Sequence, residues 1–147
     1  MTICFCGHSE ISGGECVKRK ILAFLQTLSA NENITFFIGG YGDFDHIALN
    51  ACLEYKAQYN SQTIICFITP YNSEDYFENR KYFLGKIDQI VYPELENVPK
   101  RYAIVYRNRW MIRNSDIVVC YIDHTWGGAY KTYKYALNKK KTVINVK

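Results

Sequence analysis

The sequence predicts an α/β fold, a three-layer sandwich with a mainly parallel sheet that helices cover on both faces. Apolar stretches of strand length alternate with stretches whose apolar residues recur at helical spacing. The strands are apolar without interruption, as in parallel sheets that are buried on both faces. No linker, low-complexity tract or charge block divides residues 1–147, so we expect a single domain.

The first predicted strand–turn–helix unit begins at residue 3. Residues 3–6 are apolar and strand-like, and Gly7, His8 and Ser9 end the strand. Ser12 and Glu15 have the spacing of a capping box, which indicates the start of a helix. The apolar face of that helix consists of residues at helical spacing, namely Val17, Ile21, Phe24, Leu25 and Leu28.

A second unit repeats this order. Residues 34–38 are β-branched and aromatic, which favours a strand, and residues 39–43 form a glycine-rich turn. A third strand over residues 63–68 ends at Thr69, because Pro70 disfavours helix just before it. The helix between these two strands has the apolar stripe Ile47, Ala48, Ala51, Cys52 and Tyr55.

The segment from Tyr71 to Pro99 has weaker signals. Asn72 or Ser73 is suited to cap a short helix that continues through Tyr76, Phe77, Phe83 and Leu84, and residues 89–92 favour a brief strand. After Pro99, the residues Ala103, Tyr106 and Trp110 predict a helix that carries Arg107, Asn108 and Arg109.

The last two elements surround a second glycine-rich turn. A buried strand follows Ser115 and Asp116, and a helix follows the turn and ends at Asn138. Residues 142–146 form the final buried strand. The helix is marked by Ala129, Tyr130, Tyr133, Ala136 and Leu137.

Composition limits the partners that we expect. The net charge of +4 is small for a general nucleic-acid binder, so we expect a small anionic ligand and no nucleic-acid partner. No run approaches the roughly 18 apolar residues of a membrane span, and no leader-like segment precedes the first strand, so we expect a cytoplasmic protein without membrane contact. Six cysteines without a CxxC pair indicate buried, reduced thiols.

Three turns are expected at the carboxyl edge of the sheet, where open α/β sheets bind ligands. The helix that begins at Gly127 and Gly128 offers free N–H groups, which suit a phosphate. Tyr41 or Tyr130 is suited to pack against a ribose or a base. The predicted binding residues in the turns are Gly7, His8, Ser9, Gly39, Gly40, Tyr41, Gly42, Asp43, Thr125, Gly127, Gly128, Ala129 and Tyr130.

Arg107 and Arg109 are the predicted cationic ligands, because arginine can hold phosphate through two parallel N–H bonds. We expect one of them in the site and favour Arg109; a solvated surface charge is the ordinary interpretation of either alone.

No nucleophile–base arrangement stands out. His8 and His124 lie beside predicted ligand turns, whereas Asp43, Asp45 and Asp123 suit ribose binding, base catalysis or helix capping. Metal-ligand spacing of the HxxxH or CxxC type is absent, so no metal and no cofactor are predicted.

The block from Arg107 to Asp116, the strand after it, and Gly127-Gly128-Ala129-Tyr130 resemble the end of YpsA-like proteins, an uncharacterised bacterial family of the SLOG superfamily. Residues 3–7 and 37–42 are similar to the first two strand–turn junctions of that superfamily, which includes the DprA/Smf DNA-uptake proteins and the LOG phosphoribohydrolases. The resemblance implies a Rossmann-like fold, a nucleotide-type ligand at the glycine turns, and a homodimer.

The resemblance also marks a departure from LOG enzymes. Trp126, Tyr130, Lys131 and Lys134 occupy the positions of a proline, a glycine, a threonine and the catalytic glutamate of their motif. A lysine cannot act as a carboxylate base, so LOG-type hydrolysis is doubtful although the phosphate site is retained.

The sequence therefore predicts a protein that binds a nucleotide or a nucleotide-derived small molecule, as a sensor or a sequestering protein. One alternative is a nucleotide N-glycosidase or related hydrolase that uses Asp43, Asp45 or His8. A third, less favoured interpretation is single-stranded DNA binding of the DprA type.

Overall fold

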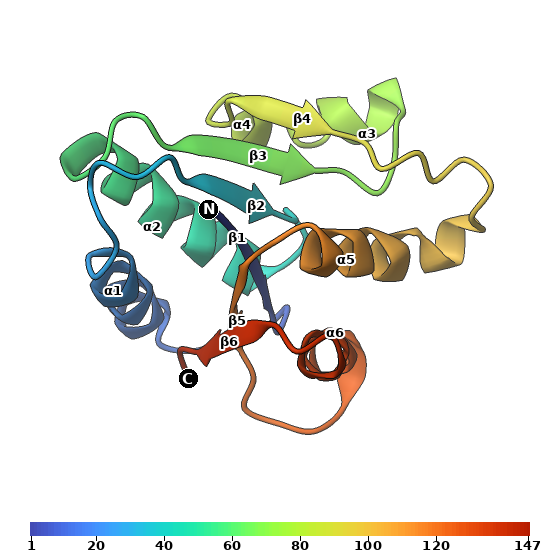
Figure 1. Cartoon of the computed structure of the whole chain (residues 1–147). Coiled ribbons are helices and arrows are strands. Elements are labelled where there is room, and N and C mark those ends of the chain that lie inside the picture. Colours follow the sequence, from blue (N-terminus) through green and yellow to red (C-terminus); the bar gives the residue numbers. More distant parts are fainter.

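The computed structural model describes residues 1–147 and shows one six-stranded sheet between layers of helices (Figure 1). The spatial order is β4-β3-β2-β1-β5-β6, and every neighbouring pair is parallel. The α/β prediction is confirmed, and the sheet is parallel throughout. The strands are β1 (Thr2–Gly7), β2 (Thr35–Ile38), β3 (Ile64–Ile68), β4 (Gln89–Val91), β5 (Ile117–Tyr121) and β6 (Thr142–Asn145).

Helices cover both faces of the sheet (Figure 1). Helices α1 (Gly14–Leu25) and α2 (Asp43–Gln58) pack on one face, and α5 (Ala103–Arg113) and α6 (Gly127–Asn138) pack on the other. Two short helices, α3 (Glu74–Glu78) and α4 (Lys81–Leu84), lie between β3 and β4 in the chain, and a 3-10 turn, η1 (Lys100–Tyr102), leads into α5.

The hydrophobic core consists of two layers because strand side chains alternate between the faces. In β1, Ile3 and Phe5 belong to the layer under α1 and α2, whereas Cys4 and Cys6 belong to the layer under α5 and α6. The four central strands are buried on both faces, which explains why they read as continuous apolar runs. The last strand, β6, was expected to be buried, but it lies at the edge of the sheet and is partly exposed, as is β4.

Two predicted helix starts have different outcomes. The capping box at Ser12 and Glu15 is wrong: Gly13 is the N-cap of α1, with a φ of 72°, and no side chain caps the helix. Glycine adopts this left-handed conformation without the steric cost of a Cβ, so it suits this position. Ser73 does cap α3, because its Oγ accepts a hydrogen bond from the Tyr76 N–H at 3.3 Å.

The buried face of α5 differs from the predicted one. Tyr106 is 44% exposed, whereas Ala103, Arg107 and Met111 are buried. These three residues are four positions apart and therefore lie on one side of the helix. Arginine is rarely fully buried, so the sequence pattern did not mark Arg107 as part of this face.

The cysteines form no disulfides. All six cysteines are free, and all except the exposed Cys16 are buried. None of the helices combines the length and the apolar surface that crossing a bilayer requires.

Candidate functional site

The crevice between the carboxyl ends of β1 and β5 lies at the switch point of the sheet. The chain proceeds from β1 outward to β4, and then returns to add β5 and β6 on the other side of β1. The connections that follow β1 and β5 therefore leave in opposite directions, and such a crevice is where open parallel sheets bind ligands.

A cavity of about 350 Å³ occupies this crevice. The turns after β1, β2 and β5 all contribute to its wall, together with the first half of α5. The lining residues are Gly7, His8, Ser9, Glu10, Tyr41, Asp45, Ile104, Arg107, Asn108, His124, Trp126, Gly127, Gly128 and Ala129.

The amino terminus of α6 forms one side of the cavity. Gly127 has a φ of 89°, and no side chain caps the helix. A Cβ on Gly128 would meet no atom within 4 Å, so the backbone faces open space. The first N–H groups of a helix have no partner inside the helix and carry a partial positive charge, so this end of α6 can accept an anion.

Arg107 forms the opposite side of the cavity and is only 1% exposed. Its Nη1 donates to the carbonyl oxygens of Gly39 at 2.6 Å and Ile68 at 2.7 Å, and its Nε donates to Asn108 Oδ1 at 2.9 Å. The remaining nitrogen, Nη2, forms no hydrogen bond with the protein. The guanidinium therefore joins the ends of β2 and β3 and still has one donor group for a ligand.

Asp45 provides a carboxylate beside this guanidinium. Its Oδ2 accepts a hydrogen bond from the Tyr41 N–H at 2.7 Å, which holds the turn after β2. Burial raises the pKa of the Asp45 carboxyl above its ordinary value, while Arg107 and the backbone N–H groups of Tyr41 and Gly42 oppose that shift. The cavity wall thus combines one fixed cation, Arg107, with the carboxyl groups of Asp45 and Glu10.

Three aromatic rings form a stack from the protein interior to the surface. The rings of His8 and His124 are 3.6 Å apart, and those of His124 and Trp126 are 3.8 Å apart. His8 is 6% exposed and Trp126 is 68% exposed, so the outer ring has a free face for a flat ligand group. Burial and the neighbouring His124 lower the pKa of His8, and Asp123 opposes them.

The predicted binding residues separate into two groups. Gly7, His8, Ser9, Tyr41, Arg107, Gly127, Gly128 and Ala129 line the cavity, whereas Gly39, Gly40, Gly42, Asp43, Arg109, Thr125 and Tyr130 do not.

The glycines outside the lining serve the packing of the turns. A Cβ on Gly42 would lie 2.5 Å from the Ser9 Cα, so this glycine allows the turns after β1 and β2 to touch. Gly40 has a φ of 69° and packs against Phe67. The Asp43 side chain accepts a hydrogen bond from the Ile11 N–H at 2.9 Å, which ties the same two turns together.

Arg107, and not the favoured Arg109, lines the cavity. The Arg109 guanidinium lies over the rings of Tyr106 and Tyr135, 5.7 Å and 5.5 Å from their centroids, on the outer face of α5 and α6. Consecutive helix residues are about 100° apart, so two residues separated by one position point to nearly opposite sides. In the sequence, the four-residue spacing of Ala103, Arg107 and Met111 was the signal that could have identified the buried side of α5.

Sequence reasoning did not include four residues of the lining, namely Glu10, Ile104, Asn108 and Trp126. Trp126 directly precedes the predicted glycine turn, and this position was the available signal for it. His124 was noted as a titratable residue beside a ligand turn, and Asp45 as a residue for ribose binding, base catalysis or helix capping. Nothing in the local sequence indicates Ile104 or Glu10, because they approach the cavity only through the packing of α5 and of the loop after β1.

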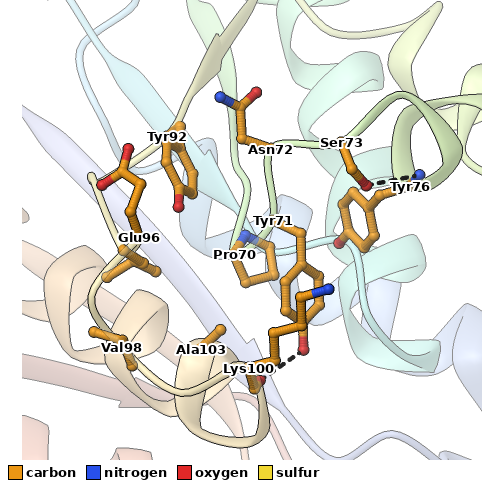
Figure 2. Close-up of a pocket in the computed structure, with 11 residues that line it drawn as sticks. Pro70, Tyr71, Asn72, Ser73, Tyr76, Tyr92, Glu96, Val98, Lys100 and Ala103 are labelled. Atoms are coloured by element: carbon orange, nitrogen blue, oxygen red, sulfur yellow. Dashed lines mark hydrogen bonds between the residues drawn. The ribbon is translucent and has the colours of Figure 1, made fainter.

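A second cavity of about 540 Å³ lies over the segment between β3 and α5 (Figure 2). Tyr71, Tyr76 and Tyr92 line it, and the Tyr71 hydroxyl donates to the Lys100 carbonyl oxygen at 3.1 Å. It is larger than the first cavity, but no glycine turn reaches it. The switch-point cavity is therefore the better candidate for an anionic ligand.

Comparison with known proteins identifies the fold. No protein-family model matches the chain, and no curated protein matches its sequence. Its structure is similar to those of DNA processing protein A from Helicobacter pylori (TM-score 0.68, 18% identity) and from Streptococcus pneumoniae (TM-score 0.68, 14% identity). Each comparison covers 97% of this chain, which spans 63% and 48% of the two proteins.

These neighbours belong to the DprA group of the SLOG superfamily, and at this identity they show the fold alone. The YpsA-like assignment stays a prediction. The expectation against a nucleic-acid partner needs correction, because the H. pylori protein has a single-stranded DNA binding mode. Net charge does not describe how charge is distributed over a surface, so by itself it does not exclude such a partner.

Proposed function

We propose that this protein binds a nucleotide or a nucleotide-derived molecule through a phosphate in the switch-point cavity. The observation that supports this most directly is the uncapped amino terminus of α6, which faces the same cavity as the buried Arg107. Backbone N–H groups at a helix start and a guanidinium are both suited to phosphate oxygens.

In this proposal the residues of the cavity have separate roles. The N–H groups of Gly127, Gly128 and Ala129 hold the phosphate, and Arg107 Nη2 adds a charged donor. The exposed face of Trp126 stacks with the base, because rings attract one another in offset or edge-on arrangements. Lys134, at the position of the LOG glutamate, does not line the cavity, so we propose binding rather than hydrolysis.

Gly128→Asp tests the phosphate site. Two like charges about 4 Å apart repel by roughly 4 kcal/mol at an effective dielectric constant of 20, so this carboxylate should weaken phosphate binding at least about tenfold. A thermal-shift screen with nucleoside monophosphates, ADP-ribose and cyclic nucleotides identifies a ligand, and calorimetry then measures the variant.

Gly128→Asn is the matched control, because it has the same shape without the charge. We expect Asn to weaken binding less than Asp does. Equal binding by the wild type and Gly128→Asp would place the ligand elsewhere, and release of free base during incubation would favour the hydrolase alternative.

A second candidate function is single-stranded DNA binding, which a specific surface favours in addition to the fold. Neither α5 nor α6 contains an aspartate or a glutamate. Arg109, Lys131 and Lys134 are exposed on these helices, and the Arg109 guanidinium lies over the rings of Tyr106 and Tyr135. Basic grooves with aromatic side chains are typical of proteins that bind single strands without sequence preference.

The two candidates differ in their dependence on salt and ligand length. Single-strand binding should weaken steeply with salt, because neutralised phosphates release counterions, and it should strengthen with oligonucleotide length. Anisotropy of labelled oligo-dT of several lengths, at two salt concentrations, measures both. An undetectable signal at low salt would remove the second candidate and leave the first intact.

A further inference from the structure

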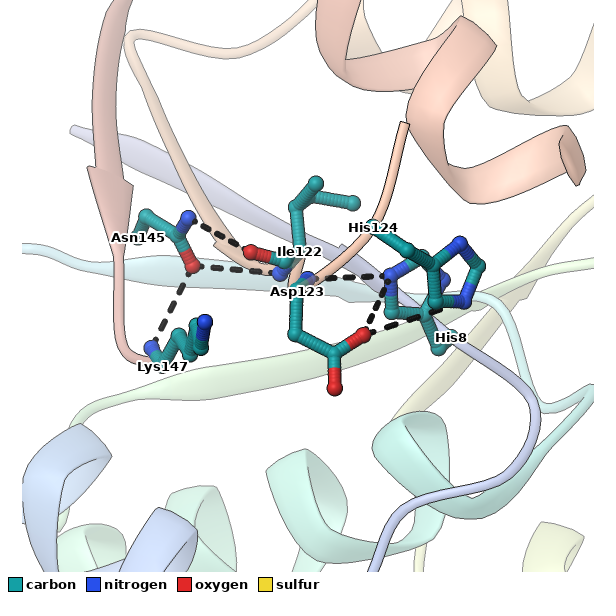
Figure 3. A network of polar contacts seen from close by, with 6 residues as sticks. All are labelled: His8, Ile122, Asp123, His124, Asn145 and Lys147. Carbon is teal, nitrogen blue, oxygen red and sulfur yellow. Dashed lines mark hydrogen bonds and ion pairs between the residues drawn. The ribbon is translucent and has the colours of Figure 1, made fainter. Parts of the chain in front are cut away.

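His8, Asp123 and His124 bring three metal-binding side chains together at the edge of the switch-point cavity (Figure 3). Asp123 Oδ1 lies 3.2 Å from His8 Nε2 and 3.7 Å from His124 Nε2. All three donor atoms lie within 4.8 Å of one another. Neighbouring ligand atoms on a tetrahedral Zn²⁺ ion lie roughly 3.3 Å apart, given Zn–N and Zn–O distances near 2.0–2.1 Å, so two of the separations are already close to that arrangement.

Two groups of Asp123 meet the same nitrogen of His8. His8 Nε2 accepts a hydrogen bond from the Asp123 N–H at 3.1 Å, which requires a lone pair on that nitrogen. The same nitrogen faces the Asp123 carboxylate oxygen at 3.2 Å, so two acceptors oppose each other. Either a proton or a metal cation between the two atoms relieves this repulsion, and a metal ligand needs the unprotonated form of histidine.

The His124 ring is not held by hydrogen bonds. Its Nδ1 is buried without a partner, and its Nε2 is 3.7 Å from the nearest carboxylate oxygen. The ring stacks on His8 with 14° between the planes, and two parallel imidazoles cannot both direct their lone pairs at one ion. Metal binding therefore requires His124 to turn, and no hydrogen bond of its side chain opposes this movement.

The backbone around the cluster is firmly positioned. The Asn145 side chain accepts a hydrogen bond from the Ile122 N–H at 3.1 Å and donates to the Ile122 carbonyl oxygen at 3.0 Å. The His8 N–H donates to the Tyr121 carbonyl oxygen at 3.3 Å, which joins the ends of β1 and β5. Two of the ligands thus come from a rigid edge of the sheet, which limits the entropy lost on binding.

We propose that His8, Asp123 and His124 bind a divalent transition-metal ion of the Zn²⁺ type. Imidazole and carboxylate together match the preference of zinc, and three protein ligands leave a position open for water or another ligand. His8 and Asp123 are 115 positions apart in the sequence, so no short metal-binding motif indicated the site. This proposal goes beyond nucleotide binding and is tested without any nucleotide.

The experiment is a titration of the full chain with Co²⁺ after treatment with a chelator. We expect one equivalent of Co²⁺ to bind with visible ligand-field absorption that Zn²⁺ abolishes. Turning of His124 should also change the fluorescence of Trp126, which stacks on it at 3.8 Å. His124→Ala and Asp123→Ala should each lower the affinity at least about tenfold, the scale seen on loss of even outer-shell partners.

Both substituted side chains are partly exposed, at 27% and 38%, so these variants should fold, and circular dichroism verifies this. His46→Ala and Cys16→Ser are the matched controls, because each removes an exposed metal-binding side chain outside the cluster. Unchanged Co²⁺ affinity in His124→Ala and Asp123→Ala would overturn the proposal. Loss of binding in a control variant but not in the cluster variants would also overturn it. The absence of stoichiometric binding by the wild type would overturn it as well.

Discussion

Arg107 shows how much one residue contributes when its side chain is buried. Its guanidinium holds the carbonyl oxygens of Gly39 and Ile68 and therefore fixes the ends of two strands at the cavity. The same group lies beside Asp45 at the cavity wall. The observed contacts of Arg107 therefore stabilise the fold, and its contact with a ligand is proposed.

Arg107→Met should lower the free energy of unfolding by about 3 kcal/mol, because it leaves two buried carbonyl oxygens without donors and Asp45 without a neighbouring cation. Urea denaturation measures this loss. Arg109→Met is the control and should change stability by less than about 0.5 kcal/mol, as surface substitutions usually do. Equal losses in the two variants would contradict the structural role of Arg107.

At the scale of elements, Gly7 decides how closely β1 and α2 pack. A Cβ at this position would lie 2.5 Å from Phe44 Cγ, inside contact distance. Neither the strand nor the helix can move without disturbing the core layer between them.

Gly7→Ala should therefore destabilise the protein by about 1–3 kcal/mol, the usual cost of overpacking a core. Thermal or urea denaturation measures the change. Gly128→Ala serves as the comparison, because its Cβ would meet no atom within 4 Å and its stability should stay the same or rise. A neutral Gly7→Ala would show that this contact relaxes easily.

Asp88 joins α2, β3 and the start of β4. Its carboxylate accepts hydrogen bonds from Lys56 Nζ at 2.7 Å and from the Ile65 N–H at 2.8 Å. Burial alone would raise the pKa of Asp88, but these two donors outweigh it and lower the pKa below the ordinary value of 3.8. The ionised form is therefore the one that the folded state favours.

The sign of the pH dependence follows from this lowered pKa. The contribution of Asp88 to stability is present above pH 3.8 and is lost as the pH falls through the lower folded-state pKa. Asp88→Asn should cost about 1 kcal/mol or less at pH 7, because the pair is partly exposed and screened. Urea denaturation between pH 7 and pH 3 should show the difference from wild type shrinking at the acid end; a constant difference would contradict it.

At the scale of the whole molecule, the net charge of +4 is unevenly distributed. The outer face of α5 and α6 has cations without carboxylates, whereas α1 and α2 carry both signs, as in the Lys18–Glu54 pair. The field that a polyanion meets therefore differs between the two faces of the sheet.

Lys131→Glu combined with Lys134→Glu should abolish detectable oligo-dT binding at moderate salt if the second candidate function holds, because two favourable phosphate contacts become repulsive. Binding of a mononucleotide in the cavity should change little. The control is Arg19→Glu combined with Lys20→Glu on α1, which makes the same change in net charge on the opposite face of the sheet. Anisotropy measures all three proteins, and equal losses in both double variants would show that only net charge matters.

The sequence by itself determined the order of strands and helices, the parallel character of the sheet and the positions of the glycine turns. These features depend on local patterns: continuous apolar strands, helical spacing, and glycine where a strand turns into a helix. Eight of the residues predicted from the turns and from α5 do line one cavity, because the carboxyl ends of parallel strands meet at one edge of the sheet.

Only the tertiary structure decided which arginine faces that cavity and which side chains meet across it. The rotation of α5 about its axis depends on packing against the sheet, and this packing buried Arg107 and left Arg109 outside. His8 meets Asp123 and His124 because β1 and β5 are neighbours in the sheet although they are distant in the chain. Contacts of this kind depend on strand order, which no local pattern encodes.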